Sequence, residues 1–480
     1  MSNYRPINAI VLAAGEGTRM RSVDPKVLHP LCGQPMVMHV LDSLAELPLE
    51  RIVVVVGHGA PLVIKALRDQ PASTKPVEFV EQSVRRGTGD AVGIALSNAA
   101  FDDDGEDDVI VVAGDQPLLR PETLAALATA HREQDAAATI LTAVLTDPSG
   151  LGRVERDRDG KIARIIEDRD ATEAQRAINE INTSIYCFRR NLLAPALRRI
   201  TPANTQGEYY LTDVIEVLRS AGHKVIAVVA EDAGEALGIN DRAQLAAADA
   251  VLRERINERW MRAGVSMVDP ARTYIDARVE IGVETRLLPG TILQGSTVVG
   301  EACVIGPDTR IADSSLGHRV TVENSVVQSC VLGDDCLVGP FAHMRADTVL
   351  AVSARVGAFV ETKNSNVGAG SKIPHLAYVG DADIGEGANI ACGTITANYD
   401  GANKHRTSIG SAVHTGSNSV LIAPVSIGDG ATIASGAVVT NDVPAGALAK
   451  GVPARITENF KRPTKKDAPK APDAPQSSAP

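Results

Sequence analysis

The hydrophobic pattern of the first half of the chain predicts a domain of alternating strands and helices. Between residues 5 and 230, apolar runs of strand length alternate with stretches of helical periodicity. The predicted strands are Ile7–Leu12, Ile52–Val56, Val77–Val80, Val109–Val112, Thr139–Leu145, Ile181–Phe188 and Val225–Ala230, and the predicted helices are Val37–Leu47, Thr88–Asn98, Pro121–Arg132 and Glu208–Ser220. This alternation is typical of an α/β Rossmann-like domain with a mostly parallel sheet covered on both faces. Such sheets bind ligands at the carboxyl ends of their strands.

One long helix is predicted over residues 241–263, which are rich in Ala, Leu, Arg and Glu. Asp241 is a candidate N-cap, and Gly264 follows the expected end. We expect residues 241–264 to connect a first domain over 1–240 with a second over 265–460.

A six-residue repeat dominates the chain after about residue 275. An aliphatic residue followed by a small one recurs in Ile281-Gly282, Val299-Gly300, Ile305-Gly306, Leu332-Gly333, Val338-Gly339, Val356-Gly357, Val367-Gly368, Ile384-Gly385, Ile409-Gly410 and Ile427-Gly428. This period predicts a parallel β-helix in which the aliphatic side chains stack inward and the small residues permit tight corners.

The repeat loses its register near 312–331, 361–366, 373–378 and 396–408. We expect these segments to be loops that carry functional groups. After about residue 461 the chain is rich in proline and charge, which predicts a disordered tail over 461–480.

Composition narrows the possible classes of function. The 48 basic and 59 acidic residues give a net charge of −11, which argues against a nucleic-acid partner. No run reaches the roughly 18 apolar residues of a membrane span, and the N-terminus does not have the pattern of a signal peptide. Six cysteines without a regular spacing predict reduced thiols, so we expect a cytoplasmic protein.

A glycine-rich turn follows the first predicted strand. It reads Leu12-Ala13-Ala14-Gly15-Glu16-Gly17-Thr18-Arg19-Met20, and Pro25-Lys26 come shortly after. Such a turn lets backbone N–H groups approach phosphates, which Arg19 and Lys26 would neutralise. Met20 stands where a dinucleotide fingerprint has its third glycine, so NAD is disfavoured, and the Walker pattern is absent. A plain strand-to-helix turn is the alternative.

Further polar residues stand at the ends of predicted strands. Asp115, in Val111-Val112-Ala113-Gly114-Asp115-Gln116-Pro117, suits a Mg²⁺ ligand beside phosphates, although an ordinary helix cap has the same pattern. The other strand-end residues are Gln82, Gly87, Thr88, Gly152, Glu167, Asn182 and Asn240, each of which could also be a turn residue.

A second polar cluster interrupts the six-residue repeat. It contains Arg345, Lys363, His375, Tyr378, Asn389 and the string Asn398-Tyr399-Asp400-Gly401. A histidine suits a general base that deprotonates an amine, and two cations suit a sugar phosphate. For His375 taken singly, a solvated or capping side chain is the alternative.

Taken together, these strings resemble the sugar nucleotidyltransferases, whose signature is L-x-x-G-x-G-T-x-M followed by P-K. Arg86-Gly87-Thr88-Gly89, Glu180-Ile181-Asn182-Thr183 and Gly207-Glu208-Tyr209-Tyr210-Leu211-Thr212-Asp213 narrow the resemblance. So do His375-Leu376-x-Tyr378 and Gly393-Thr394-x-x-x-Asn398-Tyr399. The family they resemble is that of the bacterial bifunctional N-acetylglucosamine-1-phosphate uridyltransferases and glucosamine-1-phosphate N-acetyltransferases, over residues 7 to about 450.

The resemblance implies that the first domain transfers a uridylyl group from UTP to N-acetylglucosamine 1-phosphate and releases pyrophosphate. The implied nucleotide and sugar contacts are Leu12, Ala13, Ala14, Gly15, Arg19, Lys26, Gln82, Gly87, Thr88, Ala113, Gly114, Asp115, Gly152, Glu167, Asn182 and Asn240. Asp115 and Asn240 would bind Mg²⁺.

For the second domain, the resemblance implies acetyl transfer from acetyl-CoA to glucosamine 1-phosphate, with His375 as the base. Arg345, Lys363, Tyr378 and Asn389 would hold the sugar phosphate, and Cys392, Asn398, Tyr399, Ser417 and Ser435 would contact acetyl-CoA. Cys392 and Ser435 stand where the family commonly has alanine, and Lys450–Arg455 departs from the usual ending. A left-handed β-helix and a homotrimer are also implied, with UDP-N-acetylglucosamine, a cell-wall precursor, as the product.

Two other interpretations stay open at the level of sequence. In one, the chain is a nucleotidyltransferase whose β-helix only assembles or regulates, as in glucose-1-phosphate adenylyltransferases. In the other, the chain is not an enzyme: the β-helix is a scaffold and the first domain senses a nucleotide.

Overall fold

The computed structural model describes residues 5–69, 77–98, 101 and 106–458. The chain divides into two compact units between Leu252 and Arg253. The predicted tail, 461–480, lies outside the described residues. None of the helices formed by the described residues is long and apolar enough to span a membrane. All six cysteines are described and are free thiols, as predicted.

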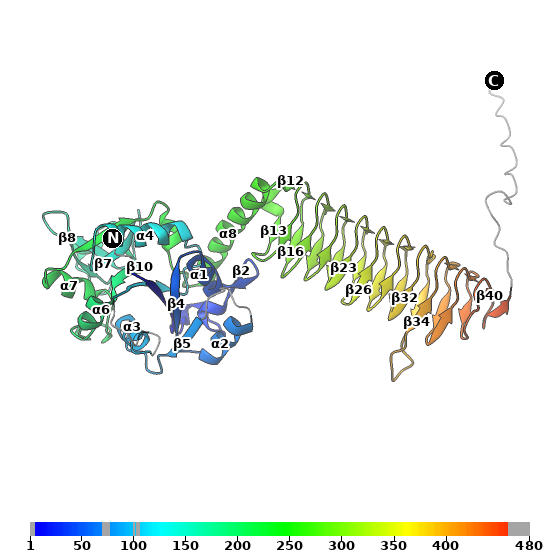
Figure 1. The fold of residues 1–480 in the computed structure, drawn as a ribbon, viewed down its shortest axis with the longest axis horizontal. Helices are drawn as coiled ribbons and strands as arrows, with labels where there is room; N and C mark the ends of the chain where they lie inside the picture. Colours follow the sequence, from blue (N-terminus) through cyan, green and yellow to red (C-terminus); the bar gives the residue numbers. More distant parts are fainter. Residues whose placement is uncertain (1–4, 70–76, 99–100, 102–105, 459–480) are drawn as a thin grey trace, which may run out of the picture. The chain divides into compact units, whose positions relative to one another are not determined.

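A sheet with the strand order β11-β7-β10-β6-β1-β4-β5 forms the centre of the first unit (Figure 1). Its strands are β1 (Ile7–Ala13), β4 (Leu49–Val56), β5 (Val77–Glu81), β6 (Asp108–Ala113), β7 (Ala138–Val144), β10 (Glu180–Arg189) and β11 (Val225–Val229). All pairings along this path are parallel except those of β10, which runs antiparallel to both β6 and β7. The predicted mostly parallel sheet is therefore confirmed.

Helices cover both faces of this sheet because successive residues of a buried strand point to opposite faces. In β4, Val54 belongs to one apolar core while Val53 and Val55 belong to the other, and all three are fully buried. The helices are α1 (Met36–Ala45), α2 (Ala60–Asp69), α3 (Thr88–Leu96), α4 (Pro121–Glu133), α5 (Glu173–Arg176), α6 (Arg190–Leu197) and α7 (Asp213–Ser220).

The predicted start of the last of these helices, at Glu208, is wrong. Helix α7 begins at Asp213, because the preceding segment pairs with the chain around the start of α3. The amide of Tyr209 donates to Arg86 O at 2.7 Å, and Tyr209 O accepts from the amide of Gly89 at 2.8 Å. The hairpin of β8 (Arg153–Arg156) and β9 (Ile162–Ile166), which extends the sheet beside β10, was not predicted. The small ribbon of β2 (Pro30–Leu31) and β3 (Gln34–Pro35) was not predicted either.

Helix α8 (Arg242–Arg262) matches the predicted connector helix, and the division between the two units falls within it. Asp241 caps it, since its Oδ1 accepts from the amides of Ala243 and Gln244 at 2.9 Å. Gly264 beyond its end has a φ of +96°, the left-handed conformation that favours glycine.

The second unit is a left-handed parallel β-helix whose coils each contribute one short strand to three faces (Figure 1). The seven-strand face contains β12 (Ser266–Met267), β15 (Arg286–Leu287), β18 (Val304–Ile305), β21 (Thr321–Val322), β24 (Leu337–Val338), β27 (Arg355–Ala358) and β30 (Lys372–His375). After an isolated bridge at Asn389 it continues with β35 (His414–Thr415), β38 (Thr432–Ile433), β40 (Leu448–Lys450) and β41 (Arg455–Thr457).

The ten-strand face contains β13 (Tyr274–Ile275), β16 (Ile292–Gln294), β19 (Arg310–Ala312), β22 (Val326–Gln328), β25 (His343–Met344), β28 (Glu361–Lys363), β31 (Tyr378–Gly380), β33 (Ile395–Ala397), β36 (Val420–Ile422) and β39 (Val438–Val439). The nine-strand face contains β14 (Glu280–Ile281), β17 (Val298–Val299), β20 (Ser315–Leu316), β23 (Cys330–Leu332), β26 (Thr348–Leu350), β29 (Asn366–Val367), β32 (Ala382–Ile384), β34 (Thr407–Ile409) and β37 (Val425–Ile427).

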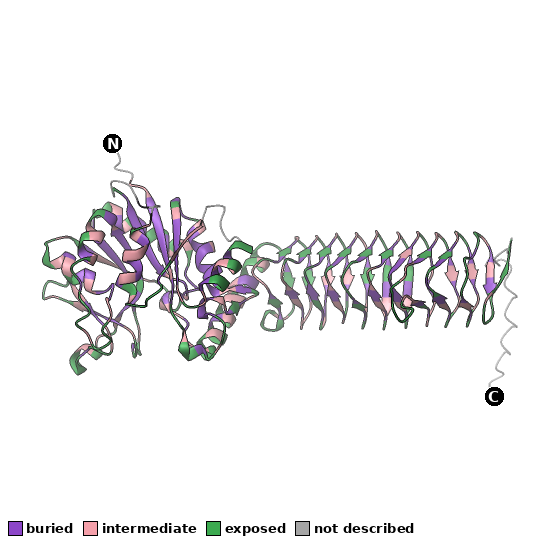
Figure 2. Ribbon diagram, turned by 90° about the horizontal axis from the view of Figure 1, so that it is seen from below, coloured by how far each residue is buried: buried purple, intermediate pink, exposed green. Residues whose placement is uncertain are grey.

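The aliphatic residues of the repeat point inward, as predicted: Val299, Ile305 and Val322 are at most 2% exposed. Figure 2 shows the buried positions running along the coils. The small residues that follow them are required by the close approach of neighbouring coils. A Cβ on Gly300, for example, would lie 2.4 Å from Gly317 O in the next coil.

Three of the four predicted loops are wrong. Segments 312–331, 361–366 and 373–378 carry strands, and the register changes there because some coils are shorter. Arg286 pairs with Val304 in a regular coil, whereas Arg310 pairs with Val326, which lies closer to it in sequence. The corners therefore absorb the missing residues.

The fourth predicted loop is confirmed over residues 398–406. Asp383 pairs with Ser408, which lies farther along the chain than the partner in a regular coil does. This coil therefore has surplus residues that leave the helix (Figure 1).

Candidate functional site

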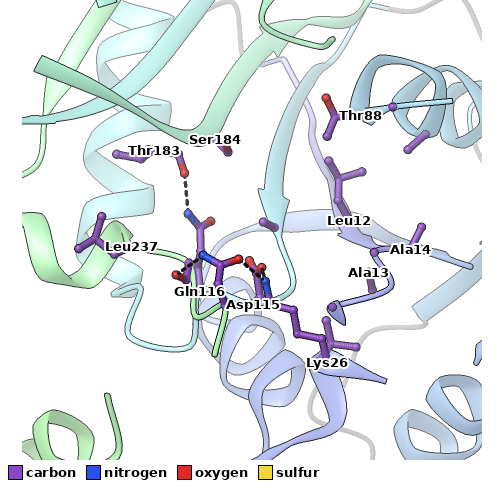
Figure 3. Close-up of a pocket in the computed structure, with 18 of the residues that line it drawn as sticks. Leu12, Ala13, Ala14, Lys26, Thr88, Asp115, Gln116, Thr183, Ser184 and Leu237 are labelled. Carbon is purple, nitrogen blue, oxygen red and sulfur yellow. Dashed lines mark hydrogen bonds and ion pairs between the residues drawn. The ribbon is translucent and has the colours of Figure 1, made fainter. Parts of the chain in front are cut away.

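A cavity of about 510 Å³ opens at the carboxyl ends of β1 and β6 in the first unit. The predicted nucleotide and sugar residues that line it are Leu12, Ala13, Ala14, Gly15, Arg19, Lys26, Gln82, Gly87, Thr88, Ala113, Asp115, Asn182 and Asn240. Asn182 reaches the same edge because β10 is antiparallel, so its first residues lie beside the carboxyl ends of its neighbours. Figure 3 shows the strand-end residues Leu12, Ala13 and Ala14 in the wall, with Asp115 and Lys26 close together.

The glycine-rich turn closes tightly on Lys26. Gly17 has a φ of +65°, and a Cβ there would lie 2.4 Å from Lys26 Cβ, so only glycine allows this approach. Gly87, which also lines the cavity, has a φ of +106°, and a Cβ there would lie 2.5 Å from Tyr209 O. Glycine is therefore required at Gly17 by a contact within the motif and at Gly87 by a contact with a segment distant in sequence.

Two side-chain oxygens in this cavity contact the same ammonium group, that of Lys26. Lys26 Nζ contacts Asp115 Oδ2 and also donates to Asn240 Oδ1 at 2.8 Å, and Arg19 donates to the same amide oxygen at 2.8 Å. A carboxylate and an amide oxygen suit Mg²⁺, so the residues present fit this metal. Over the described residues there is no group of three His, Cys, Asp or Glu side chains that could hold a metal ion. Water molecules and phosphate oxygens of the substrate would complete the coordination.

The predicted sugar-binding residues lie beside the cavity. A Cβ on Gly152 would stand 3.5 Å from Glu167 Oε2 and 3.6 Å from Asn182 Cβ, which places these three residues together. Burial raises the pKa of Glu167, and the neighbouring carboxylates, Asp213 foremost, add to this effect. Gly114 lies behind the wall, where its amide donates to Leu12 O at 2.9 Å.

Sequence reasoning missed several residues of this cavity. Gln116 is 2% exposed, and its amide nitrogen donates to Thr183 O at 2.5 Å and to Ala236 O at 2.8 Å. It thereby ties three segments together behind Asp115 (Figure 3). Its position directly after Asp115 was a usable signal. Arg85 also lines the cavity and pairs with Glu16 at 2.6 Å. The sequence carried no signal for this residue, because the pairing depends on the folded loops.

In the β-helix, the predicted sugar-phosphate residues gather on the ten-strand face. Arg345 follows β25, Lys363 ends β28 and Tyr378 begins β31, and these three strands are neighbours. Arg345 pairs with Glu361 at 2.8 Å. Asn398 follows β33, the next strand on the face, and its Nδ2 lies 3.5 Å from Tyr378 Oη. Asn389 lies instead on the seven-strand face, between Lys372 and His414.

His375 stands at the corner between these two faces, at the end of β30, and is exposed. Cys392, Ser417 and Ser435 occupy the same corner in later coils. The amide of Asn418 donates to Cys392 O at 2.7 Å, and the amide of Gly436 donates to Ser417 O at 2.9 Å. The corner thus places the predicted base in a column with three of the predicted acetyl-CoA residues.

The loop over 398–406 adds groups that the sequence did not single out. The ammonium of Lys404 lies beside that of Lys363, which lowers the pKa of Lys404. Two adjacent cations indicate a site for an anion. The predicted residue Tyr399 is exposed on this loop and donates to Gly401 O at 2.6 Å.

Comparison with protein families finds one match in each unit of the chain. Residues 9–199 match the MobA-like NTP transferase domain. Residues 406–441 match the bacterial transferase hexapeptide family, described as six repeats.

Known relatives span nearly the whole chain. It is 49% identical to the bifunctional protein GlmU of Heliobacterium modesticaldum over 453 residues, which cover 94% of this chain and 97% of that protein. It is 48% identical to the GlmU of Brevibacillus brevis, over 92% of this chain and 94% of the relative. For the GlmU of Streptomyces avermitilis the identity is 47%, over 94% and 92% of the two chains.

Similarity over both units excludes the two alternative interpretations, a β-helix without an activity of its own and a protein that is not an enzyme. The chain belongs to the GlmU family of bifunctional proteins, and it is a uridyltransferase and an acetyltransferase that together make UDP-N-acetylglucosamine.

Proposed function

We propose that the cavity of the first unit holds UTP and N-acetylglucosamine 1-phosphate, with Mg²⁺ at Asp115 and Asn240. The convergence of both side-chain oxygens on the Lys26 ammonium is the observation that supports this metal position. When bound, Mg²⁺ would neutralise charge on the phosphates. A phosphate oxygen of the sugar 1-phosphate attacks the α-phosphorus of UTP, a new P–O bond forms, and pyrophosphate leaves.

In this reaction the side chains of the cavity position the two substrates and neutralise the charge of their phosphates. None of them needs to act as a covalent nucleophile. Lys26 and Arg19 bind the triphosphate, while Gln82, Gly87 and Thr88, which line the same cavity, contact the uracil and ribose. Gly152, Glu167 and Asn182 hold the sugar. The positions of these residues in or beside one cavity support this division of roles.

At the β-helix corner, His375 removes a proton from the amino group of glucosamine 1-phosphate. The nitrogen attacks the thioester carbonyl of acetyl-CoA, the C–N bond forms, the C–S bond breaks, and CoA leaves. Arg345 and Lys363, with Lys404 beside Lys363, bind the phosphate of the sugar. Tyr378 and Asn389 complete the sugar site, and Cys392, Asn398, Tyr399, Ser417 and Ser435 contact acetyl-CoA. The exposed position of His375, in line with this column, supports its role.

We further propose that three copies of the chain associate through the β-helix. At the corner beside His375, three large apolar side chains stand in successive coils: Phe341, Phe359 and Leu376 are 57%, 61% and 57% exposed. The two rings stack at 5.3 Å, and all three residues have a φ between +52° and +60°. Bulky residues rarely adopt this conformation, and exposed apolar patches mark interaction sites. A second copy of the chain is the partner that would bury this ladder.

The two reactions occur in order in the cytoplasm: acetylation supplies the N-acetylglucosamine 1-phosphate that uridylyl transfer consumes. The product, UDP-N-acetylglucosamine, is a cell-wall precursor.

The test of both site assignments measures the two reactions separately on the full chain. We expect Asp115→Ala to lower uridylyl transfer about 100-fold or more, as loss of a metal ligand or charge partner does at other active sites. Its acetyl transfer should be unchanged, and His375→Ala should show the reverse pattern. Each variant thus controls for misfolding of the other. An unchanged rate in the reaction that a residue is assigned to would contradict that assignment.

A further inference from the structure

We infer that Asp381 is a positioning residue of the acetyl-transfer site, which fixes the side-chain amide of Asn398 so that its oxygen faces the amide N–H groups of acetyl-CoA. This inference rests on the proposed contact between Asn398 and acetyl-CoA. Asp381 follows β31 at a corner of the β-helix, and it is only 6% exposed.

The backbone holds the carboxylate of Asp381 in one place. Its amide donates to Lys363 O at 2.9 Å, its carbonyl accepts from the amide of Thr407 at 3.0 Å, and its φ is +49°. Asp381 therefore links the strand that carries Lys363 to the far end of the 398–406 loop. A residue fixed from both sides in this way makes a rigid support for a side chain that must be oriented.

The two carboxylate oxygens of Asp381 each accept from a different asparagine. Oδ1 accepts from Asn364 Nδ2 at 2.6 Å, and Oδ2 accepts from Asn398 Nδ2. An ionised carboxylate has no proton to donate, so each asparagine must turn its NH₂ group towards it. Burial works against the ionised form, but these hydrogen bonds and the charges of Lys363 and Lys404 lower the pKa of Asp381. The constraint on the amides therefore holds at neutral pH.

The orientation of the Asn398 amide decides what it can bind. With Nδ2 directed at Asp381 and near Tyr378 Oη, the oxygen Oδ1 must point the opposite way. Within the part of the chain that the structure describes, no hydrogen bond reaches this oxygen. It is thus an acceptor available to a ligand, and the pantetheine arm of acetyl-CoA carries amide N–H donors. If the Asn398 amide were inverted, its NH₂ group would face the N–H groups of acetyl-CoA, and no hydrogen bond could form.

The test compares Asp381→Asn, which keeps the size of the side chain but can present either an oxygen or an NH₂ group to Asn398, with Asn398→Ala. Loss of one ligand hydrogen bond should raise the KM for acetyl-CoA about tenfold in either variant. The rate of uridylyl transfer, which belongs to the other unit, should stay the same, and the KM for glucosamine 1-phosphate should change less than that for acetyl-CoA. In the double variant, Asp381→Asn should add no further increase to that of Asn398→Ala, because it acts through that side chain.

Asn364→Ala is the matched control, since it removes the other hydrogen bond to the same carboxylate and leaves Asn398 in place. It should leave the KM for acetyl-CoA unchanged, even where it lowers the midpoint of thermal unfolding. If Asp381→Asn raises this KM as much in the Asn398→Ala background as in the wild type, or if Asn364→Ala raises it equally, the positioning role is wrong. If Asn398→Ala itself leaves the KM unchanged, the proposed contact of Asn398 with acetyl-CoA is the assignment that fails.

Discussion

The close stacking of coils at Gly300 predicts a large, local loss of stability on adding a single methyl group. In Gly300→Ala the new Cβ would lie 2.4 Å from Gly317 O and 2.6 Å from Gly317 C, both backbone atoms. The nearest ladder bond, from the amide of Gly300 to Leu316 O, is 2.9 Å long. Moving the coils apart by about 0.6 Å to relieve the clash would stretch this bond to the limit of hydrogen bonding. Overpacking costs about 1–3 kcal/mol and the weakened bond about 1 kcal/mol, so we expect about 2–4 kcal/mol in all.

Hydrogen exchange is the suitable assay, because a coil of a solenoid contacts only its neighbours and the effect should stay local. A loss of about 2–4 kcal/mol means that amides between Val298 and Arg319 exchange about 30-fold faster or more. Gly430→Ala is the control: it makes the same chemical change at a φ of +67° with no atom within 4 Å of the new Cβ, so only backbone strain of about 1 kcal/mol remains. If the two variants lose equal protection, the requirement for glycine does not come from coil stacking.

Two further predictions concern charge and assembly. Burial raises the pKa of Asp213 to about 6 from an ordinary value of 3.8, so its ionised form costs stability that increases as the pH rises between these values. The full difference in pKa corresponds to about 3 kcal/mol of stability, which partial exposure of the carboxyl group reduces to about 1 kcal/mol. Asp213→Asn should therefore slow hydrogen exchange in α7 at pH 8 but hardly at pH 4. Equal effects at both pH values would contradict this reasoning. Phe359→Ser should shift the mass measured by light scattering from that of a trimer towards that of a monomer, and it should lower acetyl transfer more than uridylyl transfer. Val331→Ser, a change at another exposed apolar position, should leave the mass unchanged. A trimer that persists in Phe359→Ser would refute the role of the ladder of Phe341, Phe359 and Leu376.

The sequence predicted the elements whose signal is local. Buried strands such as Ile52–Val56 and Val109–Val112 are continuous apolar runs, and the β-helix repeats its aliphatic positions at a fixed period, so both folds could be predicted from neighbouring residues. The hairpin of β8 and β9 was missed because charges alternate with its apolar residues, as in Arg153-Val154-Glu155, although the Asp159-Gly160 turn was a usable signal.

Features that depend on contacts between distant segments could not be predicted in this way. Nothing near Glu208 signals that Tyr209 pairs with the loop at Arg86, and this pairing delays the start of α7. The roles of Asp381 and Lys404 likewise depend on side chains that only the folded coils bring together.

The breaks in the repeat of the β-helix are an intermediate case. The short coil from Arg310 to Val326 and the long coil from Asp383 to Ser408 both interrupt the repeat, but only the long one has residues to form a loop. Comparing the length of each break with that of a regular coil, such as the one from Arg286 to Val304, would have separated the two cases.

The regular stacking of coils makes the position of the acetyl-transfer corner adjustable in fixed steps. Each coil advances the helix by the spacing between neighbouring strands, about 4.8 Å. Insertion or deletion of a whole coil before β25 would move Arg345, Lys363 and His375 as one block along the axis and leave their mutual geometry intact. Removal of one or two residues would be absorbed at a corner, as in the coil from Arg310 to Val326, whereas removal of one whole side of a coil would move every later residue to a different face. The length of this unit can therefore change between related chains in increments of one coil, independently of the chemistry that it carries.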